Sequence, residues 1–162
     1  MPLAKAMATQ AVTLIQPGPA DLKRRFNGAV SVVFPRFSSL ADRITIEPAL
    51  LDETAYLKAA VGSFGITPEI LIIGIEPTGA EIEQAATLAA RSDVTLLFLF
   101  DAHLYPGDKR LLDRLQKAAR ALAVVLLRDP YDAAFLSPGV LGITAFGFRL
   151  CQLDAAIARL LG

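Results

Sequence analysis

The sequence has few of the features that mark secreted, membrane-spanning or nucleic-acid-binding proteins. Its single cysteine, Cys151, cannot form a disulfide within the chain and has no second thiol for a metal cluster. Sixteen basic and sixteen acidic residues balance to a net charge of zero, so we expect neither nucleic acid nor a membrane surface as a partner. The most apolar run, residues 94–100, is far shorter than the roughly 20 residues of a membrane helix. Residues 1–19 lack a secretory core, which predicts a cytoplasmic protein.

Along the chain, continuous apolar runs alternate with segments in which apolar residues recur with the periodicity of an α-helix. The runs cover residues 11–15, 29–34, 69–75, 94–100, 122–128 and 140–146. This alternation predicts a doubly wound α/β fold with a mostly parallel six-stranded sheet and helices on both faces. No internal repeat or linker interrupts the pattern, so we expect one α/β domain over residues 1–162.

Three segments have apolar residues on one helical face: 78–92, 106–122 and 150–162. In the first, Thr78 and Glu81 have the spacing of a capping box. In the second, the apolar stripe extends as far as Leu122. These faces are expected to pack on the sheet.

Candidate functional residues follow the apolar runs, because ligands of open α/β sheets bind beyond the carboxyl ends of the strands. The loops concerned are residues 35–39, 76–79, 101–108 and 128–132. Ser38 and Ser39 beside Arg36 could contact a phosphate, but no glycine-rich spacing accompanies them, which favours loop and capping roles. Asp101 resembles a phosphoacceptor of response-regulator receivers, but the earlier strand lacks the acidic pair that such a site needs for its metal ion.

The only histidine, His103, lies two residues after Asp101. It could act as a general base, but no serine or cysteine motif accompanies it, so a structural or solvated side chain is favoured. No spaced set of His, Cys, Asp and Glu residues appears in the sequence. We therefore predict no catalytic residue, no metal site and no cofactor.

The stretch "LLRDPYDAAFL" ends the fifth apolar run. Pro130 stops the strand, and Asp132 is expected to cap a following short turn. Arg128 and Tyr131 are not required by such a turn. Together with Asp101, His103 and Asp132, they are candidates for the rim of a ligand site or an interdomain interface.

Three blocks of the sequence resemble the C-terminal α/β domain of family-three glycoside hydrolases, in the bacterial β-N-acetylhexosaminidase branch. They are "RSDVTLLFLFDAHLYPGDKRLLDRL", "LAVVLLRDPYDAAFL" and "ITAFGFRLCQLDAAIARLLG", and the opening "LAKAMATQAVTLIQ" resembles the start of that domain. Asp101 replaces a common asparagine of the family and Asp108 a common glutamine, while Phe146 and Phe148 replace tyrosines.

The resemblance implies that the catalytic residues lie on an N-terminal (β/α)8 barrel, which this sequence does not contain. A retaining glycosidase needs both a nucleophile and a proton donor, so we expect no glycoside hydrolysis by this chain alone. The leading hypothesis is a non-catalytic domain that packs on such a barrel, in cis or in trans, in an enzyme acting on terminal N-acetylglucosamine; carbohydrate is a second candidate partner. The alternative is a free-standing module that binds a small ligand or phosphate.

Overall fold

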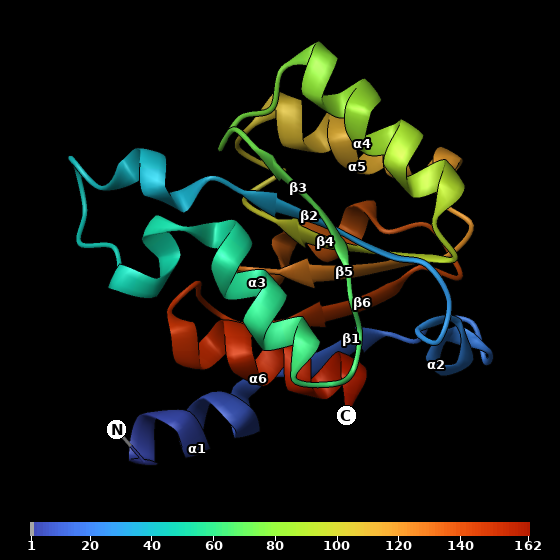
Figure 1. Ribbon diagram of the computed structural model, residues 1–162. Coiled ribbons are helices and arrows are strands. Elements are labelled where there is room, and N and C mark those ends of the chain that lie inside the picture. Colours follow the sequence, from blue (N-terminus) through green and yellow to red (C-terminus); the bar gives the residue numbers. More distant parts are fainter. Residues whose placement is uncertain (1) are drawn as a thin grey trace.

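A computed structural model describes residues 2–162 and contains one six-stranded sheet (Figure 1). The strands are β1 (Thr13–Gln16), β2 (Val30–Pro35), β3 (Glu69–Ile73), β4 (Val94–Leu99), β5 (Leu122–Leu126) and β6 (Leu141–Thr144). Their order is β1-β6-β5-β4-β2-β3. Strands β2 to β6 pair in parallel, and β1 pairs antiparallel with β6. The predicted six-stranded, mostly parallel sheet is confirmed.

Helices cover both faces of this sheet, as predicted (Figure 1). The helices are α1 (Pro2–Ala11), α2 (Leu22–Arg25), α3 (Glu53–Gly62), α4 (Gly79–Arg91), α5 (Pro106–Ala118) and α6 (Leu150–Leu161). Three short 3-10 helices are η1 (Phe37–Leu40), η2 (Pro48–Leu51) and η3 (Pro130–Phe135). Helices α4 and α5 pack on one face, while α3 and α6 pack on the other.

The pleat of the strands divides the core into these two layers. In β2, Val32 and Phe34 face α3 and α6, whereas Val33 faces α4 and α5. Strands β2, β4 and β5 are buried at every position because both of their faces are covered. This arrangement explains why their sequences are continuous apolar runs without polar alternation. None of the helices among residues 2–162 has the length and apolar character needed to span a membrane.

Helix α4 begins with the predicted capping box. The backbone N–H of Glu81 donates to Thr78 Oγ1 at 3.3 Å, and the N–H of Thr78 donates to Glu81 Oε2 at 2.8 Å. The other carboxylate oxygen of Glu81 accepts from the N–H of Gly74 at 3.0 Å. One glutamate therefore fixes both the start of α4 and the end of the preceding strand.

Several predicted boundaries are wrong. Helix α5 ends at Ala118 rather than at residue 122, because the chain becomes extended at Ala119 and Leu122 already belongs to β5. The first strand starts at Thr13 because α1 continues through Ala11. Helices α1 and α3 were not predicted, since α1 buries only Ala8 and α3 has a weak apolar stripe.

Replacing the cap of α4 by Thr78→Ala is expected to lower the free energy of unfolding by about 1 kcal/mol, because it leaves a helix N–H without its acceptor. Urea denaturation monitored by circular dichroism measures this change. Thr87→Ala, on the exposed side of the same helix, is the matched control. Equal losses in the two variants would show that the cap does not stabilise α4.

Candidate functional site

The loops that follow the parallel strands lie at one edge of the sheet, as the sequence predicted. We call this the carboxyl edge. Its polar residues come mainly from residues 101–108 after β4 and 128–132 after β5, and these strands are neighbours. The two loops are joined by side-chain hydrogen bonds, which bring together residues that are about 30 positions apart in the sequence.

Asp132 is the buried centre of this contact. Its Oδ2 accepts from the N–H of Ala102 at 2.7 Å, and its Oδ1 accepts from the N–H of His103 at 2.8 Å. The prediction that Asp132 caps the following turn is wrong. Asp129 fills that role, since its Oδ1 accepts from the N–H of Tyr131 at 3.0 Å. Pro130 is the first residue of η3, so Asp129 precedes the helix and caps it. Asp132 lies inside η3 and contacts the loop after β4.

His103 also binds Asp132, through its ring Nδ1, at 2.8 Å from Oδ1. Because an ionised carboxylate only accepts hydrogen bonds, Nδ1 carries a hydrogen and the imidazole is oriented by Asp132. This hydrogen bond raises the pKa of His103 above its ordinary value, with the charges of Asp132 and Asp129 acting in the same direction. The sequence showed no partner for His103, because Asp132 reaches it only through the fold.

Asp101 is paired within the chain with Arg128, whose Nη1 lies 2.6 Å from Asp101 Oδ2. The guanidinium also lies over the ring of Phe100, 5.7 Å from its centroid. Asp101 has a φ of 52°, in the left-handed region that aspartate tolerates better than most residues. Burial raises the pKa of Asp101 even though Arg128 acts against this shift.

Tyr131 is the most exposed of the five candidate residues. Its side chain is 70% exposed, and its ring meets the His103 ring edge to face with centroids 5.5 Å apart. The structure thus brings Asp101, His103, Arg128, Tyr131 and Asp132 together at the carboxyl edge. It adds Asp129, which sequence reasoning treated only as part of a turn.

Asp108, in the first turn of α5, is a further buried acid at this edge. It is 3% exposed, and its Oδ2 has no hydrogen-bond partner within residues 2–162. Burial, followed by the negative charges of Asp132, Glu76 and Asp101, raises the pKa of Asp108 to about 8. Asp108 is therefore mostly protonated at neutral pH. The loop that contains Asp108 was selected from the sequence, but the burial of its carboxyl depends on the fold and could not be predicted.

The serines after β2 have the local roles that the sequence favoured. Ser39 Oγ donates to the carbonyl of Arg36 at 2.7 Å, within the turn of η1. The N–H of Ser38 donates to the buried carboxylate of Glu53 at 2.7 Å. A carboxylate already occupies this backbone donor, which counts against a phosphate at the same place.

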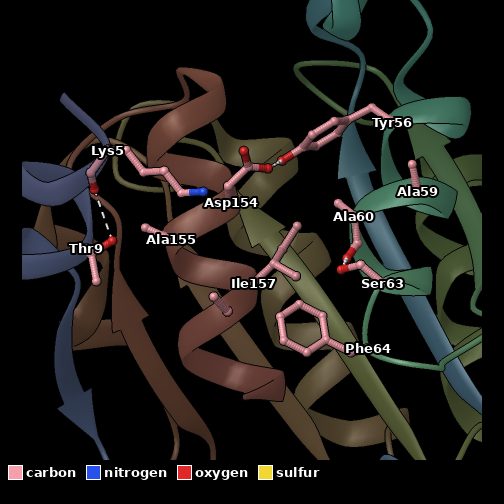
Figure 2. A pocket seen from close by; sticks show the side chains of 11 residues that line it. Lys5, Thr9, Tyr56, Ala59, Ala60, Ser63, Phe64, Asp154, Ala155 and Ile157 are labelled. Carbon is pink, nitrogen blue, oxygen red and sulfur yellow. Dashed lines mark hydrogen bonds between the residues drawn. The ribbon is translucent and has the colours of Figure 1, made fainter. Parts of the chain in front are cut away.

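A separate hollow of about 460 Å³ lies between α1, α3 and α6 (Figure 2). Its walls are mostly apolar and include Ala59, Phe64 and Ile157. At its polar end the hydroxyl of Tyr56 donates to Asp154 Oδ1 at 2.9 Å, and burial raises the pKa of Tyr56. Figure 2 shows a wide groove rather than a group of reactive side chains converging on one point.

Asp132→Ala is expected to lower the free energy of unfolding by about 3 kcal/mol, because it leaves the N–H groups of residues 102 and 103 without their acceptor. Asp129→Ala, which removes only the cap of a short turn, should cost about 1 kcal/mol. Denaturant unfolding of both variants measures the difference. Equal losses would contradict the central role of Asp132.

Asp108→Asn should stabilise the protein in a pH-dependent way. The pKa of Asp108 is raised in the folded state from its ordinary value of 3.8, so folding stability is highest below that value and falls as the pH rises toward about 8. Because the side-chain amide of asparagine does not ionise, the Asp108→Asn variant does not lose stability in this way as the pH rises. The gain in unfolding free energy should therefore grow by roughly 2 kcal/mol between about pH 5 and pH 7.

Unfolding curves measured across this pH range test the Asp108 prediction. Asp113→Asn, at a half-exposed position of the same helix, is the matched control. A gain for Asp108→Asn that does not change with pH would show that Asp108 ionises as easily in the folded chain as in the unfolded one.

Comparison with known proteins gives a consistent match at the level of the fold. No family model and no curated protein sequence matches the chain. A glycoside hydrolase family 3 β-N-acetylglucosaminidase from Paenibacillus sp. str. FPU-7 superposes with a TM-score of 0.79 and 21% identity, over 98% of this chain and 29% of that protein.

Two further structures belong to the same group of enzymes. A fungal multi-domain family 3 β-N-acetylglucosaminidase matches 99% of this chain and 17% of its own length, with a TM-score of 0.71 and 15% identity. A family 3 β-glucosidase from Bifidobacterium adolescentis matches 99% of this chain and 27% of its own, with a TM-score of 0.67 and 15% identity. The chain spans less than a third of each of these proteins. Over nearly its whole length, it has the fold of one part of the family-three glycoside hydrolases.

Proposed function

We propose that the chain is the non-catalytic C-terminal domain, or a free-standing relative of that domain, of a β-N-acetylhexosaminidase-type glycoside hydrolase acting on terminal N-acetylglucosamine. Its role is to pack on a (β/α)8 catalytic barrel and support it. The observation that carries the proposal is the match over 98% of this chain to 29% of the Paenibacillus enzyme. Most of that enzyme therefore lies outside the matched part.

The carboxyl edge supports a packing role. Large apolar side chains are exposed there, beside the charged cluster: Leu104 at 61% and Tyr131 at 70%. Ile44 and Phe146 are also exposed and line a hollow of about 680 Å³ beyond the end of β6. Exposed apolar side chains gathered on one part of a surface are typical of interaction sites. We therefore assign the barrel contact to this edge.

The acidic residues of the edge do not suit hydrolysis of a glycosidic bond by this chain. Asp101 is paired with Arg128, and Asp132 is saturated by two backbone N–H groups and the His103 ring. A glycosidase needs one carboxylate or equivalent group free to attack and another free to donate a proton. In this proposal the residues that catalyse glycoside hydrolysis lie on the barrel.

A phosphate-binding module fits the edge less well. Asp101 is already paired with the guanidinium of Arg128, and two further carboxylates, those of Asp129 and Asp132, lie beside His103. An anionic ligand would be repelled by these carboxylates. A neutral small ligand remains compatible with the apolar hollows, and a thermal-shift screen with sugars would identify one.

The proposal predicts that the purified chain does not hydrolyse a chromogenic β-N-acetylglucosaminide, while a family-three barrel encoded upstream or elsewhere in the same genome binds it. Size-exclusion chromatography and calorimetry measure this binding. Tyr131→Asp combined with Leu104→Asp should weaken it at least tenfold, because charged groups would replace the apolar contacts. Met7→Asp, at an exposed apolar position of α1, is the matched control.

Three outcomes would contradict the proposal. Turnover that survives repurification of the chain would assign catalysis to it. If no family-three barrel from the genome binds, the chain does not have the proposed packing role. If the carboxyl-edge variant binds as tightly as the unchanged chain, the packing surface is not the carboxyl edge.

A further inference from the structure

We propose that Asp101, His103 and Asp129 bind a divalent transition-metal ion of the zinc type at the carboxyl edge. One ligand atom from each residue lies within 4.8 Å of the others. Asp101 and His103 come from the loop after β4, and Asp129 comes from the loop after the adjacent parallel strand β5. This goes beyond the proposed packing role, which requires no metal.

The His103 ring is oriented as a metal ligand. Its Nδ1–H donates to the buried Asp132, so in the neutral imidazole Nε2 carries the lone pair that a metal ion would bind. Metal-binding histidines are commonly fixed in this way, by a carboxylate on the nitrogen that does not bind the metal. Here Nε2 faces Asp129 Oδ2 at 4.0 Å, which is too far for a hydrogen bond.

The distribution of charge around these atoms favours a cation. Three aspartates, Asp101, Asp129 and Asp132, surround His103, and Arg128 forms an ion pair with Asp101 alone. Because Arg128 contacts only one oxygen of Asp101, a second cation would reduce the repulsion among the carboxylates.

A second observation, independent of the three ligands, points to the same place. Asp108 is 3% exposed, and its Oδ2 has no hydrogen-bond partner within residues 2–162. Besides burial, the negative charges of Asp132, Glu76 and Asp101 are among the causes that raise the pKa of Asp108. A buried polar atom without a partner calls for an explanation, and an ion or its bound water beside Asp101 would supply one.

The distances allow coordination after small side-chain movements. Zinc binds nitrogen and oxygen at about 2.0–2.2 Å, which places tetrahedral ligands about 3.3 Å apart. Asp101 is held by Arg128, while His103 and Asp129 are partly exposed and open to an ion from solvent. Three protein ligands leave one position for water. An imidazole with two carboxylates favours zinc over magnesium or calcium.

Titration of the metal-free 162-residue chain with Zn²⁺, followed by calorimetry and thermal unfolding, tests the site. We expect saturable binding of one ion per chain and a melting temperature that rises with Zn²⁺ concentration. Co²⁺ should give the visible absorption of a four-coordinate site. Absence of saturable Zn²⁺ binding would overturn the proposal.

Variants locate the ion. His103→Gln and Asp129→Asn should each weaken Zn²⁺ binding at least tenfold, and the asparagine keeps the turn because it caps as well as aspartate does. Asp113→Asn and Cys151→Ser are the matched controls and should bind as the unchanged chain does, since the first changes a carboxylate of α5 and the second the only thiol. Binding that persists in both ligand variants, or that is lost in Cys151→Ser, would place the ion elsewhere and overturn the proposal.

Discussion

The buried carboxylate of Asp132 is the interaction on which the carboxyl edge depends. A buried charge is tolerated only when hydrogen bonds replace its lost hydration. Asp132 meets this requirement with the N–H groups of residues 102 and 103 and the ring of His103, all from the loop after β4. The loops after β4 and β5 therefore have fixed positions relative to each other, and the imidazole orientation follows from the same contact.

The overall architecture was predictable because it depends on long, repeated patterns. Continuous apolar runs identified β2, β4 and β5, and the spacing of Thr78 and Glu81 located the start of α4. The failures concern short or weakly patterned elements. Periodicity could not separate the end of α5 from the start of β5, because Leu122 continues the helical stripe by chance.

The candidate site was predictable as a location but not as a set of contacts. The rule that ligands bind beyond parallel strands selected Asp101, His103, Arg128, Tyr131 and Asp132, and the structure brings them together. The sequence could not show that Asp132 contacts residue 103, because 29 residues separate them and only the pairing of β4 with β5 makes them neighbours. For the same reason, no ligand spacing revealed Asp101, His103 and Asp129 as a group.

Asp101 and Asp108, two acids at the carboxyl edge, respond differently to burial. Burial and the neighbouring negative charges raise the pKa of Asp108 to about 8, which keeps it mostly neutral near pH 7. Asp101 is different, because its pairing with Arg128 favours the charged form and offsets part of its burial. Of these two acids, Asp101 therefore contributes the negative charge, and it is one of the three residues whose ligand atoms lie within 4.8 Å of one another.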